Sequence, residues 1–151
     1  IGKAITNAEQ RKFDPEVLFR SRLAPDQFAF DRQVQSACDT AKFVAAKLGG
    51  KEPPAHPDTE QNLAELRARI ATVIAYLETF KREDFVGGLD RIVTFPRWNG
   101  KTMRGGDYLD HHALPNFYFH FTTAYAILRH NGVPVGKLDY LGERPFIDPA
   151  K

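Results

Sequence analysis

Hydrophobic residues between positions 63 and 80 recur at alternating steps of three and four, which is the spacing of one face of an α-helix. This face consists of Leu63, Leu66, Ile70, Val73, Leu77 and Phe80. Side chains spaced in this way form a seam suited to packing in a helical bundle. Either Asp58 or Thr59 can cap the start of this helix, and the glycine pair at 87 and 88 stops the region.

A second long helix is predicted from Pro25 or Asp26 to Leu48, because its apolar residues also share one face. That face consists of Phe30, Val34, Ala37, Cys38, Ala41, Ala45 and Leu48. The two glycines that follow end the helix. The proline-rich stretch 51–58 is then a connection in which no regular element persists.

The amino-terminal residues predict two further helical segments. Residues 1–11 read as the end of a helix already under way. A short helix follows, with Asp14 as N-cap, Pro15 at the first position and Glu16 in the first turn. We expect upstream residues, before Ile1, that complete the first helix.

Residues 91–106 differ from the rest because they predict a β-hairpin. Two short segments, one of them from Ile92 to Phe95, flank the Asn99-Gly100 pair. That pair favours a type I′ turn, in which both central residues have positive φ. Pro96 makes the ribbon exposed and edge-like.

The last long helix is predicted from about Asp107 to the sequence His130-Asn131, with Gly132 at the C′ position and Pro134 blocking continuation. Apolar residues cover most of its circumference, which is typical of a helix at the centre of a domain. Residues 133–151 carry glycine and proline at short intervals and predict an extended surface tail.

One stripe of this last helix is polar. It consists of His112, Asn116, His120 and Thr123, which point roughly the same way. Leaving one such group buried and unpaired costs about 1–3 kcal/mol. The stripe therefore hydrogen-bonds to neighbouring helices, lines a wet pocket or ligates a metal. Pro115 removes a backbone hydrogen bond four residues back and predicts a kink near His111 and His112.

The histidine spacing argues against a metal site built from this helix alone. Zinc sites on a helix commonly use two histidines at i and i+4. His112 and His120 are eight residues apart, about 12 Å along an unbroken helix. Asn116 lies between them, but a neutral amide oxygen suits harder ions, and binds them weakly.

Composition excludes several classes of function. The 151 residues have a net charge of +2, from 21 basic and 19 acidic residues. This balance does not indicate a surface that binds nucleic acid or an anionic membrane. The one cysteine, Cys38, excludes an intrachain disulfide and reads as a small buried hydrophobe. No membrane span or signal peptide is evident, so a cytoplasmic location is expected. No phosphate-binding glycine loop or nucleophile elbow is present.

The chain resembles the DinB/YfiT-like superfamily, whose members are four-helix bundles with a metal site between helices. It is most similar to an uncharacterised branch, a conserved domain of unknown function. The likeness rests on residues 22–42 ("RLAPDQFAFDRQVQSACDTAK"), residues 107–142 ("DYLDHHALPNFYFHFTTAYAILRHNGVPVGKLDYLG") and the hairpin, and it covers nearly the whole chain. It implies a single all-α, DinB-like four-helix bundle with a small β-hairpin before the last long helix. Without a complete first helix the bundle would have an open groove, which a partner chain or a remodelled N-terminus would cover.

The resemblance also implies where a metal triad would sit. His120, nine residues before Arg129, matches the second histidine of the superfamily's HxxxH pair. Asn116 replaces the first, and Ser36 or Gln35 stands where the third ligand is expected. The usual triad is therefore expected to be absent, with at most weak divalent-metal binding at His120, or to be rebuilt from other residues.

Three hypotheses for function follow. In the first, a polar small-molecule pocket uses His112, Asn116, His120, Thr123, Ser36, Gln35 and Asp39; Asp39 either orients His120 or makes a surface ion pair. In the second, the protein is a non-enzymatic structural or stress-related binding module, with a homodimer as its expected form. In the third, a rebuilt site supports metal-dependent hydrolysis or thiol transfer, with His120 as ligand or general base. Trp98 is either exposed at the ribbon tip or folded over the pocket mouth.

Overall fold

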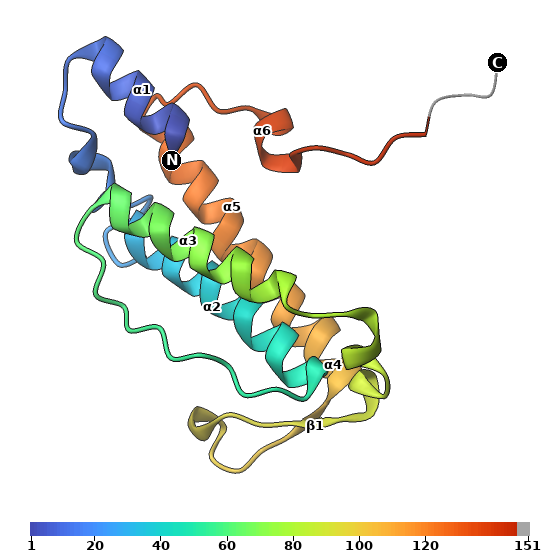
Figure 1. Cartoon of the computed structure of the whole chain (residues 1–151). Coiled ribbons are helices and arrows are strands. Elements are labelled where there is room, and N and C mark those ends of the chain that lie inside the picture. Colours follow the sequence, from blue (N-terminus) through green and yellow to red (C-terminus); the bar gives the residue numbers. More distant parts are fainter. Residues whose placement is uncertain (148–151) are drawn as a thin grey trace.

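Three long helices lie side by side in the computed structural model, which describes residues 1–147 (Figure 1). They are α2 (Phe30–Gly49), α3 (Leu63–Glu78) and α5 (Leu114–His130), and α2 packs against both of the others. Helix α1 (Gly2–Arg11) lies at the end of the bundle where α5 terminates (Figure 1). The predicted helical bundle with a small hairpin before its last long helix is confirmed.

Short elements connect these helices or, in the case of α6 (Lys137–Leu141), follow the last of them. They are the 3-10 helices η1 (Pro15–Leu18), η2 (Arg82–Phe85), η3 (Gly88–Asp90) and η4 (Pro96–Trp98), strands β1 (Ile92–Val93) and β2 (Met103–Arg104), helix α4 (Gly105–Tyr108), the π-helix η5 (Leu109–Ala113) and helix α6. Within the described residues, no helix is both long and apolar enough to cross a membrane.

The predicted seam of α3 supplies part of the main core. Leu63, Leu66 and Val73 are buried there, together with Phe30 of α2 and Ile127 of α5. A second, smaller cluster joins the end of α2 to the hairpin and α4, and consists of Leu48, Val93, Phe95, Tyr108 and Ala113. This second cluster anchors the hairpin against the bundle, where it can form one wall of a site.

Helix α2 starts later than predicted. Residues 19–29 fold back on themselves, because the Phe30 amide donates to the Ser21 carbonyl at 2.9 Å and the Asp31 amide donates to the Phe19 carbonyl at 3.1 Å. Ala29 is the N-cap in an extended conformation. Pro25 and Asp26 therefore belong to the preceding turn, a consequence of contacts that helical periodicity does not encode.

The N-cap of α3 also differs from the prediction. The Asn62 side chain caps this helix by accepting from the Glu65 amide at 2.9 Å. Asp58 instead pairs with the arginines Arg32 and Arg69. Asp58, which the local pattern predicted as a possible N-cap, therefore forms tertiary ion pairs instead.

The hairpin keeps its predicted turn but has shorter strands. Asn99 and Gly100 have φ values of 51° and 81°, and the Lys101 amide donates to the Trp98 carbonyl at 3.0 Å, as in a type I′ turn. The paired strands stop at Val93 and Met103. Between them lie η4 and a long loop, because Pro96 has no amide hydrogen for the ladder and begins η4 instead.

Pro115 produces a widened turn. The amide of Leu114 donates to the carbonyl of Leu109, five residues back, and closes the π-helix η5. Pro115 follows immediately and cannot donate, so the backbone resumes α-helical bonding only after it. The disturbance predicted near His111 and His112 is therefore a π-helical turn, a feature frequent at functional sites.

Two predictions about the carboxy-terminal part were wrong. Helix α5 is not buried all round, since Leu114, Tyr118 and Phe119 are exposed. The segment after Gly132 is not wholly extended, since it contains α6, whose Tyr140 ring lies 4.7 Å from the Phe121 ring. Gly132 does end α5 as predicted, with a φ of 81°. The last part of the predicted tail, residues 148–151, lies outside the described residues.

A polar pocket as candidate functional site

A pocket of about 380 Å³ lies between α2, the start of the last long helix and the hairpin loop. Its lining residues are Arg32, Ser36, Asp39, Thr40 and Phe43 from α2, Phe95 and Arg97 from the hairpin, and Tyr108, His112, Asn116 and His120 from α4, η5 and α5. Three parts of the chain that are far apart in sequence therefore meet at the polar stripe.

Five of the seven candidate residues line this pocket: His112, Asn116, His120, Ser36 and Asp39. The other two do not. Gln35 turns toward the loop before α3, where its Nε2 donates to Glu60 at 2.8 Å. Thr123 is buried, and its hydroxyl donates to the Phe119 carbonyl at 2.7 Å.

Two hydrogen bonds of Gln33 fix which ring nitrogen of His120 carries a hydrogen. Gln33 Nε2 donates to the Phe28 carbonyl at 3.0 Å, which leaves the amide oxygen Oε1 as an acceptor. His120 Nδ1 lies 2.8 Å from that oxygen, so Nδ1 must donate and Nε2 keeps its lone pair. Nε2 has no hydrogen-bond partner in the described part of the chain, and the ring lines the pocket. The lone pair is therefore free to accept from a ligand.

His120 is neutral at neutral pH. Burial lowers the pKa of this imidazole below its ordinary value, and the positive charge of Arg32 lowers it further. The ring is also packed between aromatic groups, with Phe28 stacked at 6.4 Å and Phe119 edge-on at 5.2 Å. His120 thus presents an uncharged, oriented acceptor.

Asn116 is oriented in a similar way. Its Nδ2 donates to the Thr40 hydroxyl at 2.7 Å, and that hydroxyl donates to the Ser36 carbonyl at 2.7 Å. These two hydrogen bonds fix the orientation of the Asn116 amide, and its Oδ1 atom has no hydrogen-bond partner in residues 1–147. Asn116 and His120 therefore offer two acceptors one helical turn apart.

The opposite end of the pocket is formed by His112 and the hairpin. Arg97 Nη2 approaches His112 Nε2 at 3.5 Å, a long and weak contact. Burial, and then the charge of Arg97, lower the pKa of His112. The Trp98 ring lies 5.4 Å from the His112 ring and 4.9 Å from the Phe95 ring. Of its two predicted positions, Trp98 therefore takes the folded one, packed against pocket residues, and is not exposed at the ribbon tip. Burial raises the pKa of Tyr108 to about 12, so this phenol is uncharged at neutral pH.

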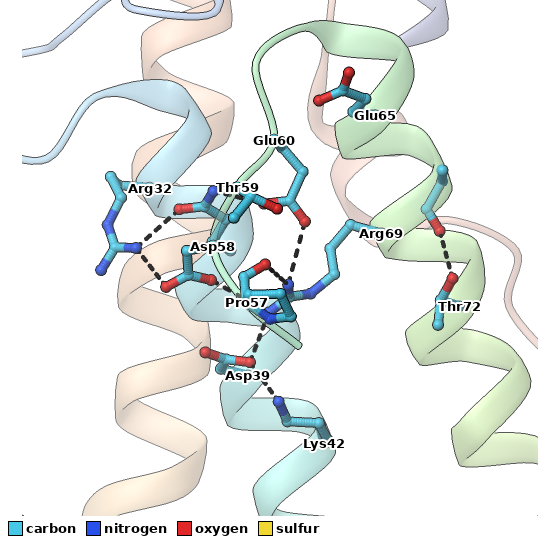
Figure 2. A network of polar contacts seen from close by, with 12 residues as sticks. Arg32, Asp39, Lys42, Pro57, Asp58, Thr59, Glu60, Glu65, Arg69 and Thr72 are labelled. Atoms are coloured by element: carbon cyan, nitrogen blue, oxygen red, sulfur yellow. Dashed lines mark hydrogen bonds and ion pairs between the residues drawn. The ribbon is translucent and has the colours of Figure 1, made fainter. Parts of the chain in front are cut away.

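Asp39 belongs to a neighbouring ion-pair network (Figure 2). Its Oδ1 accepts from Arg69 and from Lys42, each at 2.8 Å. Arg69 is almost fully buried and also reaches Asp58 at 3.4 Å and Glu60 at 3.2 Å. Of the two predicted roles for Asp39, the structure supports the ion pair; Gln33, not Asp39, orients His120.

The donor set does not fit the metal site that the superfamily resemblance implies. Among residues 1–147, no three His, Cys, Asp or Glu side chains are grouped so that they could hold an ion. His120 lines the pocket, and the uncharged polar groups that line it with His120 include the Asn116 amide and the Ser36 hydroxyl. Both are poor ligands for zinc.

Sequence reasoning missed Gln33, Thr40, Arg32 and Arg97. A signal existed for the α2 residues, because Gln33, Ser36 and Thr40 are spaced by three and four and form a second polar stripe. Arg97 lies in the hairpin loop, where no periodicity indicates direction. Its place in the pocket depends on how the hairpin packs on the bundle.

A separate apolar groove of about 540 Å³ runs along the other side of α2. Its walls include Phe30, Val34, Cys38, Ile70, Phe117 and Tyr125, with Ile1 of the chain start and Tyr140 of α6. Cys38 is buried here, as its helical position predicted. This groove is mostly apolar, whereas the pocket around His120 contains the polar candidate residues.

Comparison with known proteins agrees with the helical bundle. The model of a family described as a domain of unknown function, DUF1993, matches residues 1–141. The chain belongs to this family. A crystal structure of a DinB family member from Shewanella denitrificans is similar to this DUF1993 chain, with 53% identity and a TM-score of 0.93. The match covers 98% of the present chain and 84% of the other. A search of curated proteins found no match.

Proposed function

We propose that this DUF1993 domain binds a small polar molecule in the pocket around His120, without a stoichiometric metal ion. The observation that carries the proposal is the contact between Gln33 and His120, which orients a neutral imidazole of the pocket lining and leaves its Nε2 lone pair free to accept. Asn116 adds a second oriented acceptor. A ligand with hydrogen-bond donors complements these groups.

A fragment screen by NMR, which records both the fragment signals and the histidine ring signals of the protein, tests this proposal, with His120→Ala as the variant and His130→Ala as the matched control. His130 is exposed in the last turn of the same helix, outside the pocket. We expect fragments that bind the wild type and the control, shift the His120 ring resonances and lose binding in His120→Ala. Fragments that leave those resonances unchanged in every case would contradict the proposal.

The same hydrogen bonds favour one other function, a non-enzymatic structural or stress-related module whose polar stripe is a core network. In that case His120→Ala leaves Gln33 Oε1 unpaired and lowers the free energy of unfolding by about 1–3 kcal/mol, with no ligand affected. Chemical denaturation measures the stability of His120→Ala and His130→Ala. A stability loss in His120→Ala without any fragment binding favours the structural module, and fragment binding that depends on His120 favours the pocket.

A further inference from the structure

The charges around the pocket do not cancel. Three charged side chains line it: Arg32, Asp39 and Arg97. Asp39 is balanced by Arg69 and Lys42, and Arg32 pairs with Asp58. Arg97 has no carboxylate within ion-pair distance among residues 1–147. The pocket therefore carries one guanidinium whose charge is not compensated by the protein.

The position of Arg97 suits recognition of a ligand group. Its guanidinium lies 4.9 Å from the Phe95 ring centroid, which holds the planar group at the pocket wall. Among residues 1–147, its one polar contact is the 3.5 Å approach to His112 Nε2. An arginine has five N–H donors in a fork that matches a carboxylate or phosphate, so most of these donors are unused.

The other residues around Arg97 also indicate what kind of ligand the pocket suits. Phe43, Phe95 and Tyr108 line the pocket near Arg97 and His112, since Phe95 packs against Phe43 and Arg97 and Tyr108 stacks on His112. Burial, and then a neighbouring arginine, lower the pKa values of both pocket histidines. Neither ring then competes with Arg97 as a positive charge, so a bound anion would pair with the guanidinium.

We infer that the ligand of the proposed pocket is a small organic oxyanion, a carboxylate or a phosphate monoester, held by Arg97 with its apolar part against Phe95 and Tyr108. This inference rests on the proposed function, because it names the class of molecule that the same pocket binds. Arg97 acts as the residue that selects for negative charge, while Asn116 and His120 accept hydrogen bonds from the remainder of the ligand.

The test compares benzoate, phenyl phosphate and benzamide by isothermal titration calorimetry in phosphate-free buffer at low ionic strength. Benzamide has nearly the shape of benzoate but no charge. We expect the preferred anion to bind roughly tenfold or more tightly than benzamide, as a charge-assisted bidentate pair requires. Preference for benzoate identifies a carboxylate ligand, and preference for phenyl phosphate identifies a phosphate monoester.

Arg97→Gln and Lys101→Gln form a matched pair for this experiment, since both remove one positive charge from the exposed hairpin loop and only Arg97 lines the pocket. The preference for the anion should disappear in Arg97→Gln and persist in Lys101→Gln. Equal binding of benzamide and the anions, no binding of any probe, or the same preference in both variants would overturn the inference. The fragment screen with His120→Ala judges the proposed pocket independently of this outcome.

Discussion

At the scale of single residues, the pocket depends on which hydrogen bonds are already made. Gln33 accepts from His120 Nδ1 only because its own Nε2 is engaged by the Phe28 carbonyl. A neutral histidine with a defined tautomer is a better acceptor than one that exchanges between two forms, because no free energy is needed to select the form that binds. The pair thus preorganises His120 before any ligand arrives.

The lowered pKa of His120 predicts how stability changes with pH. The folded state holds this group below its ordinary pKa, so the unfolded chain binds more protons as the pH falls through about 6.5. The contribution of His120 to stability is complete above that pH and declines below it. His112 and His56 also have lowered pKa values and add to the same trend.

We therefore expect His120→Gln to lose less stability than the wild type when the pH is lowered from about 8 to about 5. Urea unfolding at both pH values measures this difference. Histidine NMR titration provides the direct check, and a His120 pKa above its ordinary value in the folded protein would contradict the explanation.

Cys38 provides a second prediction at this scale. Burial raises the pKa of the thiol to about 11, so almost none of it is thiolate at neutral pH. Alkylation by iodoacetamide should be roughly 100-fold slower in the native protein than in the denatured chain, whose thiol has an ordinary pKa. Mass spectrometry of timed samples measures both rates, and equal rates would show that Cys38 is neither buried nor inert.

At the scale of elements, Arg69 connects α3 to α2 and to the loop before α3 (Figure 2). Its side chain is only 4% exposed, and its partners Asp39, Asp58 and Glu60 are three carboxylates in one place. The arginine therefore prevents mutual repulsion of these groups and fixes the loop. Because Asp39 also lines the pocket, the network supports one pocket wall.

Arg69→Met retains most of the apolar stem but removes the charge. We expect it to reduce the free energy of unfolding by about 3 kcal/mol, since the carboxylates lose their common partner but keep some contact with water. Arg67→Met, on the exposed face of the same helix, should change it by less than about 0.5 kcal/mol. Urea denaturation compares the two variants, and equal effects would contradict the structural role of Arg69.

At the scale of the whole molecule, the bundle gathers polar groups without gathering metal ligands. Ser36 of α2 and Asn116 of α5 line the same pocket as His120, and within residues 1–147 no group of three His, Cys, Asp or Glu side chains could hold a metal ion. Among the described residues, the pocket therefore presents hydrogen-bonding groups and the Arg97 guanidinium, and not a set of metal ligands.

We expect protein purified without a tag or added metal to contain far less than one equivalent of zinc, nickel, manganese or iron. The thermal unfolding midpoint should be unchanged by EDTA, because no bound ion contributes to folding. Elemental mass spectrometry and a thermal melt measure both properties. Close to one equivalent of any of these metals would favour the third hypothesis, a rebuilt metal-dependent site.

Sequence reasoning by itself determined the long helices, the bundle that they form, the type I′ turn and the polar stripe of the last helix, because each follows from a local period or a local preference for positive φ. Only the tertiary structure decided that α2 starts at Phe30, that Asn62 rather than Asp58 caps α3, and that the hairpin loop brings Arg97 to His112. These features depend on contacts between segments distant in sequence, whose partners no periodicity specifies. For the same reason the sequence indicated His120 but not Gln33, the residue that orients it.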